Sequence, residues 1–138
     1  MPSFRFGHAT GADWRRTAAK CLEQIGSGFG SLGFVYATDV LADDFGSILE
    51  MLKRGTGVAN WVGTVGTGVL ATGREYMDQP AMAVMVGDFD PASFRILSSM
   101  RSAADIAQAS VRCESGEGNF PVVHADPPDA EVGALING

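Results

Sequence analysis

The spacing of apolar side chains predicts two amphipathic helices in the first half of the chain. After Asp13, a favourable N-cap residue, apolar side chains recur at helical intervals until Gly26, a favourable helix stop. A second segment with the same spacing begins at Thr38 or Asp39 and closes at Gly55. The apolar faces comprise Trp14, Ala18, Cys21, Leu22 and Ile25 in the first helix, and Leu41, Phe45, Ile48, Leu49 and Leu52 in the second.

Shorter apolar segments around these helices are typical of β-strands. Alternation of apolar and polar residues over 4–8 predicts a first strand. Apolar runs at 32–37 and 58–65 predict a second and a third strand of the buried kind. The resulting βαβαβ order favours parallel strands with helices packed against the sheet.

The pattern changes after the third strand. Residues 66–80 are rich in glycine and polar side chains and are expected to form a loop. Residues 81–87 are a very apolar strand, and a turn at 88–93 leads into a short strand at 94–97. We expect these two strands to pair as an antiparallel hairpin, which makes the sheet mixed.

The last part of the chain carries two further helices and one strand. Ser102 and Asp105 form a capping-box-like start to a third helix. That helix carries Ile106, Ala109 and Cys113. A strand is expected at 120–124 and a last helix from Asp129. The predicted fold class is therefore α/β, with a mixed, partly parallel sheet flanked by helices in the order βαβαβ-loop-ββ-αβα.

Composition narrows the functional classes. The chain has 138 residues, 46% of them hydrophobic, and a net charge of −6, which suits one globular domain and argues against nucleic-acid binding. Its apolar stretches are too short to span a membrane, and the N-terminus lacks a signal-peptide pattern, so a cytoplasmic location is expected. Cys21 and Cys113 lack a C-x-x-C partner and are expected to be buried thiols in helices.

The segment WVGTVGTGVLATGREY, at 61–76, allows three interpretations, the simplest of which is a glycine-rich turn that lets chain segments approach closely. Residues 66–71 match G-x-G-x-x-A after a predicted strand, as in a dinucleotide-binding oxidoreductase. That motif requires a helix to begin at the glycines, yet the window up to Pro80 shows no sustained apolar stripe. We therefore favour the wall of a small-molecule pocket and keep the nucleotide-dependent oxidoreductase as an alternative.

Polar residues end several of the predicted strands, including both histidines of the chain, His8 and His124. If the first and sixth strands are neighbours, the two imidazoles converge, and a metal or haem site becomes an option. The other interpretation is that each histidine caps a nearby carbonyl or helix end.

The predicted site is a ligand pocket rather than a catalytic centre. The chain has no G-x-S-x-G motif, and both cysteines lie in predicted helices, so we expect no enzymatic activity and no catalytic residue. The two histidines are too far apart in sequence to show metal-ligand spacing, so we also expect no bound metal. Glycines would bring a ligand near the backbone, threonines would supply hydroxyls, and the two aromatic residues apolar surface. The candidate ligand-binding residues are Trp61, Gly63, Thr64, Gly66, Thr67, Gly68, Tyr76, Thr38, Asp39, His8 and His124.

These segments, in this order, resemble the N-terminal region of the FIST domain, a small-ligand sensory domain of bacterial signalling proteins. The matching pieces are the Trp14 helix, LGFVYATD at 32–39, ILEMLKRGTGV at 48–58, WVGTVGTGV at 61–69, GREYMDQPAMAVMV at 73–86 and VVHADP at 122–127. Together they span nearly the whole chain, and the resemblance rests on their order.

The resemblance implies sensing of amino acids or related metabolites, with histidine kinases or chemoreceptors as partners. Some members of the family look like haem-binding nitric oxide sensors, so haem is a further option here. The family unit is longer, and the last predicted helix barely begins before Gly138. We therefore expect residues 1–138 to be a single FIST N-terminal-like domain that lacks the C-terminal half of the unit. A different class of protein, a structural module whose exposed sheet edge pairs with another subunit, is also compatible with the pattern.

Overall fold

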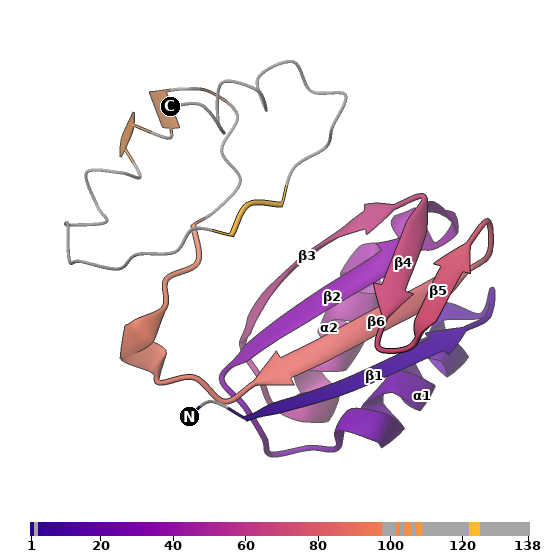
Figure 1. Ribbon diagram of the computed structural model, residues 1–138, viewed down its shortest axis with the longest axis horizontal. Helices are drawn as coiled ribbons and strands as arrows, with labels where there is room; N and C mark the ends of the chain where they lie inside the picture. The colour runs from indigo at the N-terminus through magenta and orange to yellow at the C-terminus, as the bar shows by residue number, and fades with distance from the viewer. Residues whose placement is uncertain (2, 98–101, 103, 106, 109–121, 125–138) are drawn as a thin grey trace. The chain divides into compact units, whose positions relative to one another are not determined.

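The chain divides into two units, Met1–Phe94 and Arg95–Gly138. The computed structural model describes residues 1, 3–97, 102, 104, 105, 107, 108 and 122–124. The strands of the first unit are β1 (Phe4–Thr10), β2 (Leu32–Thr38), β3 (Asn60–Gly66), β4 (Gly68–Ala71), β5 (Arg74–Met77) and β6 (Ala81–Gly87) (Figure 1). Its α-helices are α1 (Trp14–Ile25) and α2 (Phe45–Thr56). Its 3₁₀ helices are η1 (Asp39–Asp44) and η2 (Pro91–Ser93).

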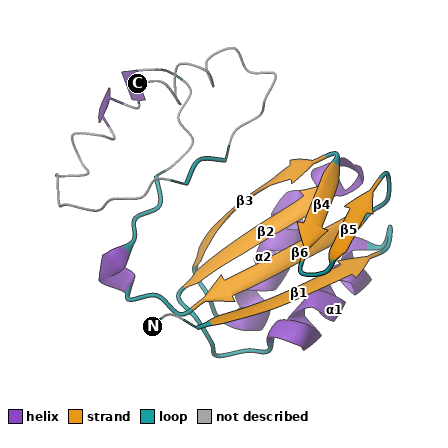
Figure 2. Cartoon of the chain, viewed as in Figure 1, coloured by secondary structure: helices purple, strands orange, loops and turns teal. Residues whose placement is uncertain are grey.

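Four strands form one mixed sheet in the order β1-β6-β2-β3. Strand β6 runs antiparallel to both β1 and β2, whereas β2 and β3 are parallel neighbours. Strands β1, β2 and β3 therefore run in the same direction, and α1 and α2 lie together on one face of the sheet (Figure 2). The predicted α/β class with a mixed, partly parallel sheet is confirmed, but β6 separates β1 from β2.

Helix α1 follows the prediction at both ends. The Asp13 carboxylate accepts hydrogen bonds from the backbone N–H groups of Arg15 and Arg16, at 3.0 and 3.3 Å. These bonds satisfy two of the donors that every helix start leaves open. Gly26 ends the helix with φ +75°, and its N–H donates to the Leu22 carbonyl at 2.8 Å.

Helix α2 begins later and ends later than predicted. A 3₁₀ helix, η1, occupies the first part of the predicted helix, and α2 itself begins at Phe45. The residue that closes it is Gly57, in the left-handed conformation at φ +80°, rather than Gly55. Gly55 serves packing instead, because a Cβ there would lie 2.6 Å from a Leu22 methyl carbon on α1. Its lack of a side chain lets the two helices approach closely.

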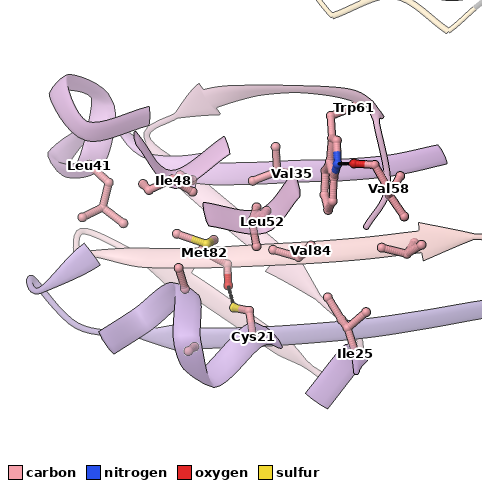
Figure 3. Packing of buried hydrophobic residues seen from close by; sticks show 14 residues of the cluster. Cys21, Ile25, Val35, Leu41, Ile48, Leu52, Val58, Trp61, Met82 and Val84 are labelled. Carbon is pink, nitrogen blue, oxygen red and sulfur yellow. Dashed lines mark hydrogen bonds between the residues drawn. The ribbon is translucent and has the colours of Figure 1, made fainter. Parts of the chain in front are cut away.

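The core lies between the helices and the sheet (Figure 3). It includes the predicted helix residues Ala18, Cys21, Ile25, Leu41, Ile48 and Leu52, together with Val35, Met82, Val84 and Val86 of the central strands. Burial raises the pKa of the Cys21 thiol to about 12, so the predicted buried thiol is confirmed for this cysteine.

The predicted loop at 66–80 is a β-hairpin for most of its length. Strands β4 and β5 pair antiparallel around a turn at Thr72 and Gly73, where Gly73 has φ +73°. The sequence prediction missed this hairpin because each strand has only four residues and the intervening glycines resemble a loop.

The predicted strand at 94–97 is wrong, since none of these residues is in a strand. Strand β6 could not pair with it, because both of its edges are hydrogen-bonded, one to β1 and the other to β2. Within the second unit, Ser102 and Asp105 form the predicted capping box, with reciprocal bonds of 3.1 and 3.2 Å. Residues 104, 105, 107 and 108 are helical, whereas 122–124 are not in a strand.

The remaining predictions for the second unit lie outside the described residues. They concern Ile106, Ala109, Cys113, the start of the strand at 120–124, and the last helix from Asp129. Within the described part of the chain, no helix combines the length and the hydropathy needed to cross a membrane.

Candidate functional site

One face of the four-stranded sheet points away from both helices, and we call it the distal face. Gly7 marks the opposite face, because a Cβ there would lie 2.8 Å from the Cys21 carbonyl oxygen of α1. Side chains alternate along a strand, so the neighbours Phe6 and His8 point to the distal face. The same alternation and the strand register define the members of the distal face. From β1 and β2 they are Phe4, Phe6, His8, Thr10, Leu32, Phe34, Tyr36 and Thr38. From β3 and β6 they are Asn60, Val62, Thr64, Gly66, Ala81, Ala83, Met85 and Gly87.

The strand register arranges these side chains in rows across the sheet. One row is polar at three of its four positions and consists of His8, Ala83, Tyr36 and Thr64. The adjacent row is apolar and consists of Phe6, Met85, Phe34 and Val62. The distal face therefore combines hydrogen-bonding groups with apolar surface, and its members include no Asp, Glu, Lys or Arg.

The β4–β5 hairpin lies over part of this face, with β4 in contact with β6 and β2 (Figure 1). Val69 and Tyr76, which oppose each other across the hairpin, are both buried. The Tyr76 hydroxyl lies 2.6 Å from Nδ1 of His8, with the ring centroids 5.6 Å apart. When the imidazole proton is on Nε2, the phenol donates and Nδ1 accepts. This contact joins two predicted ligand residues across 68 positions of sequence.

Burial and exposure differ along the two rows. Burial raises the pKa of the half-buried Tyr36 phenol above its ordinary value, so this group is a neutral hydroxyl at physiological pH. Phe6 is 51% exposed, while Phe34, Val62 and Met85 are half-buried. A polar row without Asp, Glu, Lys or Arg, beside half-exposed apolar side chains, can bind a small molecule with one hydrogen-bonding end and one apolar end.

The glycine segment does not have the geometry of a dinucleotide site. Gly66 ends β3 and Gly68 begins β4, with a bend at Thr67 between them, so no helix begins at the glycines where the fingerprint requires one. The oxidoreductase alternative that rested on this motif is therefore wrong.

Three of the predicted ligand residues in this region have packing roles. Trp61 lies on the helix side of β3 in the core, and its indole N–H donates to the Val58 carbonyl at 2.8 Å (Figure 3). A Cβ on Gly63 would lie 1.8 Å from the Val35 carbonyl oxygen, so this glycine permits close approach of β2 and β3. A Cβ on Gly68 would collide with the Met77 sulfur at 2.2 Å. Their predicted contact with a ligand stays a prediction.

Four more predicted residues gather where β2 and β3 end. Thr38 is buried, and its hydroxyl oxygen accepts from the Ala81 N–H at 2.9 Å. Asp39 is exposed at the start of η1, Gly66 is exposed at the end of β3, and Thr67 is exposed directly after it. Because Thr38 is the register partner of Gly66, the structure does bring these strand ends to one edge of the sheet. Thr64 lies further back, on the distal face.

The two histidines have different settings from those predicted. His8 does not end its strand, since β1 continues to Thr10, and the side chain bonds to Tyr76. His124 belongs to the second unit, where burial lowers the pKa of its imidazole below the ordinary value. Convergence of the two imidazoles stays a prediction. Among the described residues, no group of three His, Cys, Asp or Glu side chains could hold a metal ion.

The sequence prediction missed several members of the distal face, notably Tyr36, Phe6 and Phe34. Alternation along β1 and β2 was a usable signal, because it separates these residues from those that face the helices. The missing information was the position of β6, which sets His8 and Tyr36 on either side of Ala83.

A family model, described as the FIST N domain, matches residues 31–138. The match begins after α1, yet β1 belongs to the same sheet through its pairing with β6. No curated protein matches the chain significantly.

Proposed function

Because the chain belongs to the FIST N domain family, a family of sensory domains in signal transduction, we propose that it binds a small molecule on the distal face. The proposed binding position is the polar row next to the hydrogen bond between His8 and Tyr76. The family is not known for enzymatic activity, and the proposed role is binding without chemical conversion.

The observation that carries this proposal is the contact of 2.6 Å between His8 Nδ1 and the Tyr76 hydroxyl. It places two groups that can each donate or accept a hydrogen bond on a sheet face that is otherwise mostly apolar. Hydrogen bonds in such surroundings are specific, because a ligand that does not match leaves polar groups unpaired. The hydroxyls of Tyr36 and Thr64 in the same row extend the set of partners.

The ligand class we propose is an amino acid or a similar small metabolite. Its ammonium or hydroxyl group would bond to the polar row, and its apolar part would contact Phe6, Phe34 and Met85. Because the distal face carries no Asp, Glu, Lys or Arg, it favours a ligand of small net charge, since a strongly charged one would lose hydration without gaining an ion pair with these residues.

We further propose that binding is reported to a signalling partner, such as a histidine kinase or a chemoreceptor, in the cytoplasm. Support for this finer assignment comes from the sensory character of the family and from the buried thiol of Cys21, which suits a reducing compartment.

Thermal unfolding in the presence of single candidate ligands tests the proposal. The twenty standard amino acids, NAD(P) and hemin would each be added to the protein. A ligand at one hundred times its Kd stabilises the folded state by about 2.7 kcal/mol, which raises Tm by several degrees. We expect stabilisation by one or a few amino acids, and loss of this stabilisation in His8→Leu.

A matched control is Val40→Ala, which truncates a side chain that is 61% exposed on η1. This variant should respond to the ligand as the wild type does. Equal stabilisation of His8→Leu and the wild type would place the ligand elsewhere. Stabilisation by hemin alone would replace the amino acid with haem, and stabilisation by none of the compounds would contradict the proposed ligand class.

A further inference from the structure

The β4–β5 hairpin is a separate two-stranded sheet. Within the described residues its ladder runs only between β4 and β5, and the four strands of the main sheet pair among themselves. An isolated two-stranded hairpin is marginally stable in water. The position of this hairpin over the distal face therefore depends on side-chain contacts and on its two connections to the main sheet.

Few side chains of the hairpin anchor it. Of residues 68–77, only Val69 and Tyr76 are buried, and they form one cross-strand pair. The outward side carries Leu70 and Met77, which are 74% and 49% exposed. Tyr76 adds the hydrogen bond to His8 on β1, so one residue supplies both apolar contact and a polar anchor.

The two connections differ in how they are held. On one side the chain passes from β3 to β4 through Gly66, Thr67 and Gly68, where two of three residues lack a side chain. On the other side Asp78 has φ +54°, a conformation that only a few residue types adopt readily. Just beyond it, the Pro80 carbonyl accepts from the Thr10 hydroxyl at 2.7 Å and from the Gly11 N–H at 3.0 Å. The chain is thus held by two hydrogen bonds at Pro80, whereas the connection at Gly66–Gly68 carries little side-chain bulk.

We infer that the β4–β5 hairpin is a hinged cover over the distal face, and that the hydrogen bond between Tyr76 and His8 is the latch that holds it closed. A ligand whose ammonium or hydroxyl group donates to His8 Nδ1 takes the place of the Tyr76 phenol and releases the hairpin. The latch stands on the contacts alone, whereas its release by a ligand rests on the proposed function. Opening of the hairpin would expose different residues next to β2 and β6. A signalling partner would then recognise the open state by this altered surface.

Hydrogen exchange without any ligand tests the latch. Tyr76→Phe keeps the buried ring and removes only the hydroxyl. We expect amides in residues 68–77 to exchange about fivefold faster, the factor that corresponds to the net contribution of one hydrogen bond. Exchange in β2 should remain at the wild-type rate. Cleavage by trypsin after Arg74, which is exposed beside the turn, gives a second readout and should accelerate similarly.

Two further pairs of variants make this test specific. His8→Leu should reproduce the effect of Tyr76→Phe, whereas His8→Asn, whose amide can occupy the position of Nδ1, should retain slower exchange. Leu70→Thr changes an outward residue of the same hairpin and should leave the exchange rate unchanged. Wild-type exchange in both Tyr76→Phe and His8→Leu would overturn the latch.

Amide hydrogen exchange in the presence of single amino acids tests whether a ligand releases the β4–β5 hairpin. Stabilisation of the protein together with faster exchange in residues 68–77 would support ligand-driven opening. Stabilisation with unchanged or slower exchange there would leave the proposed function in place and overturn the opening. If no amino acid stabilises the protein, both the ligand class and ligand-driven opening are overturned, and the variants alone decide the latch.

Discussion

The indole ring of Trp61 lies against the backbone of Gly33, its register partner on the neighbouring strand β2. A Cβ at Gly33 would lie 2.4 Å from two carbon atoms of the ring. The largest side chain of the core therefore depends on the absence of a side chain across the strand pair, and it is the structure rather than local sequence that explains this glycine.

Gly33→Ala should destabilise the protein for this reason. The added methyl group must displace the indole, and overpacking of this kind costs about 1–3 kcal/mol in the free energy of unfolding. Urea denaturation measures it directly. Gly46→Ala is the control, because a Cβ at Gly46 in α2 meets no atom within 4 Å. Alanine is the better helix former, so this variant should gain about 0.5–1 kcal/mol. Equal stability of the two variants would contradict the packing explanation.

Thr38→Val should cost about 1–3 kcal/mol of stability. The substitution keeps the shape of the side chain but removes the oxygen that accepts from the buried Ala81 N–H. The comparison is Thr64→Val, whose hydroxyl is less buried and bonds to the adjacent Val65 carbonyl at 3.3 Å. Its effect should stay within about 0.5 kcal/mol. If both variants unfold at the same urea concentration, Thr38 has no special role in joining β2 to β6.

Stability should fall at alkaline pH through Cys21. The thiol has a pKa of about 12 in the folded protein, against an ordinary value of 9.0. The folded state therefore holds this proton more tightly, so the contribution is constant below pH 9 and is lost as pH rises toward 12. Between these two pKa values, the free energy of unfolding should fall by about 1.4 kcal/mol for each pH unit.

The measurement compares the wild type with Cys21→Ala by urea denaturation at several pH values from 8 upward. Other groups titrate in the same range, but they do so in both proteins, so only the difference reports the thiol. The free energy of unfolding of the wild type should fall relative to that of the variant as pH rises above 9. A difference that does not change with pH would mean that the thiol titrates normally in the folded protein.

Asp13→Ala should lower the free energy of unfolding by about 1 kcal/mol, because two N–H groups at the start of α1 lose their acceptor. Asp13→Asn keeps an acceptor and removes the charge. The Asp13 carboxylate also lies 3.8 Å from the Arg16 guanidinium, an exposed ion pair of little value. We therefore expect Asp13→Asn to remain within a few tenths of a kcal/mol of the wild type. Thermal or urea unfolding that ranks the two variants together would assign the effect to the ion pair instead.

The elements that the sequence predicted well share one property, which is that their determinants are close together in the chain. Helix α1 is an example, because Asp13, Gly26 and the apolar spacing between them lie within one segment. The same holds for the capping box at Ser102 and for the apolar strand β6. Predictions that depended on a distant partner were less successful, as with the strand at 94–97, whose intended partner β6 pairs with β1 and β2.

The candidate site shows the same division. His8 and Tyr76 were each predicted as ligand residues, but for separate reasons and with His124 as the expected partner of His8. Their contact requires both the hairpin and its position over the distal face, and neither follows from the glycine-rich composition of residues 66–80.

The α/β class, helix α1, the approximate location of α2 and the four strands of the main sheet could be inferred from the sequence, as could the resemblance to a sensory family. Helix hydrogen bonds join residues four apart, and strand burial follows a two-residue period. Both features therefore depend on residues that are close together in the sequence. The position of β6 between β1 and β2, and the bond between Tyr76 and His8, became apparent only in the folded structure. Strand order and register join residues that are far apart in the sequence, and many pairings of similar strands bury comparable apolar surface. The packing of the whole unit therefore selects one strand order and register.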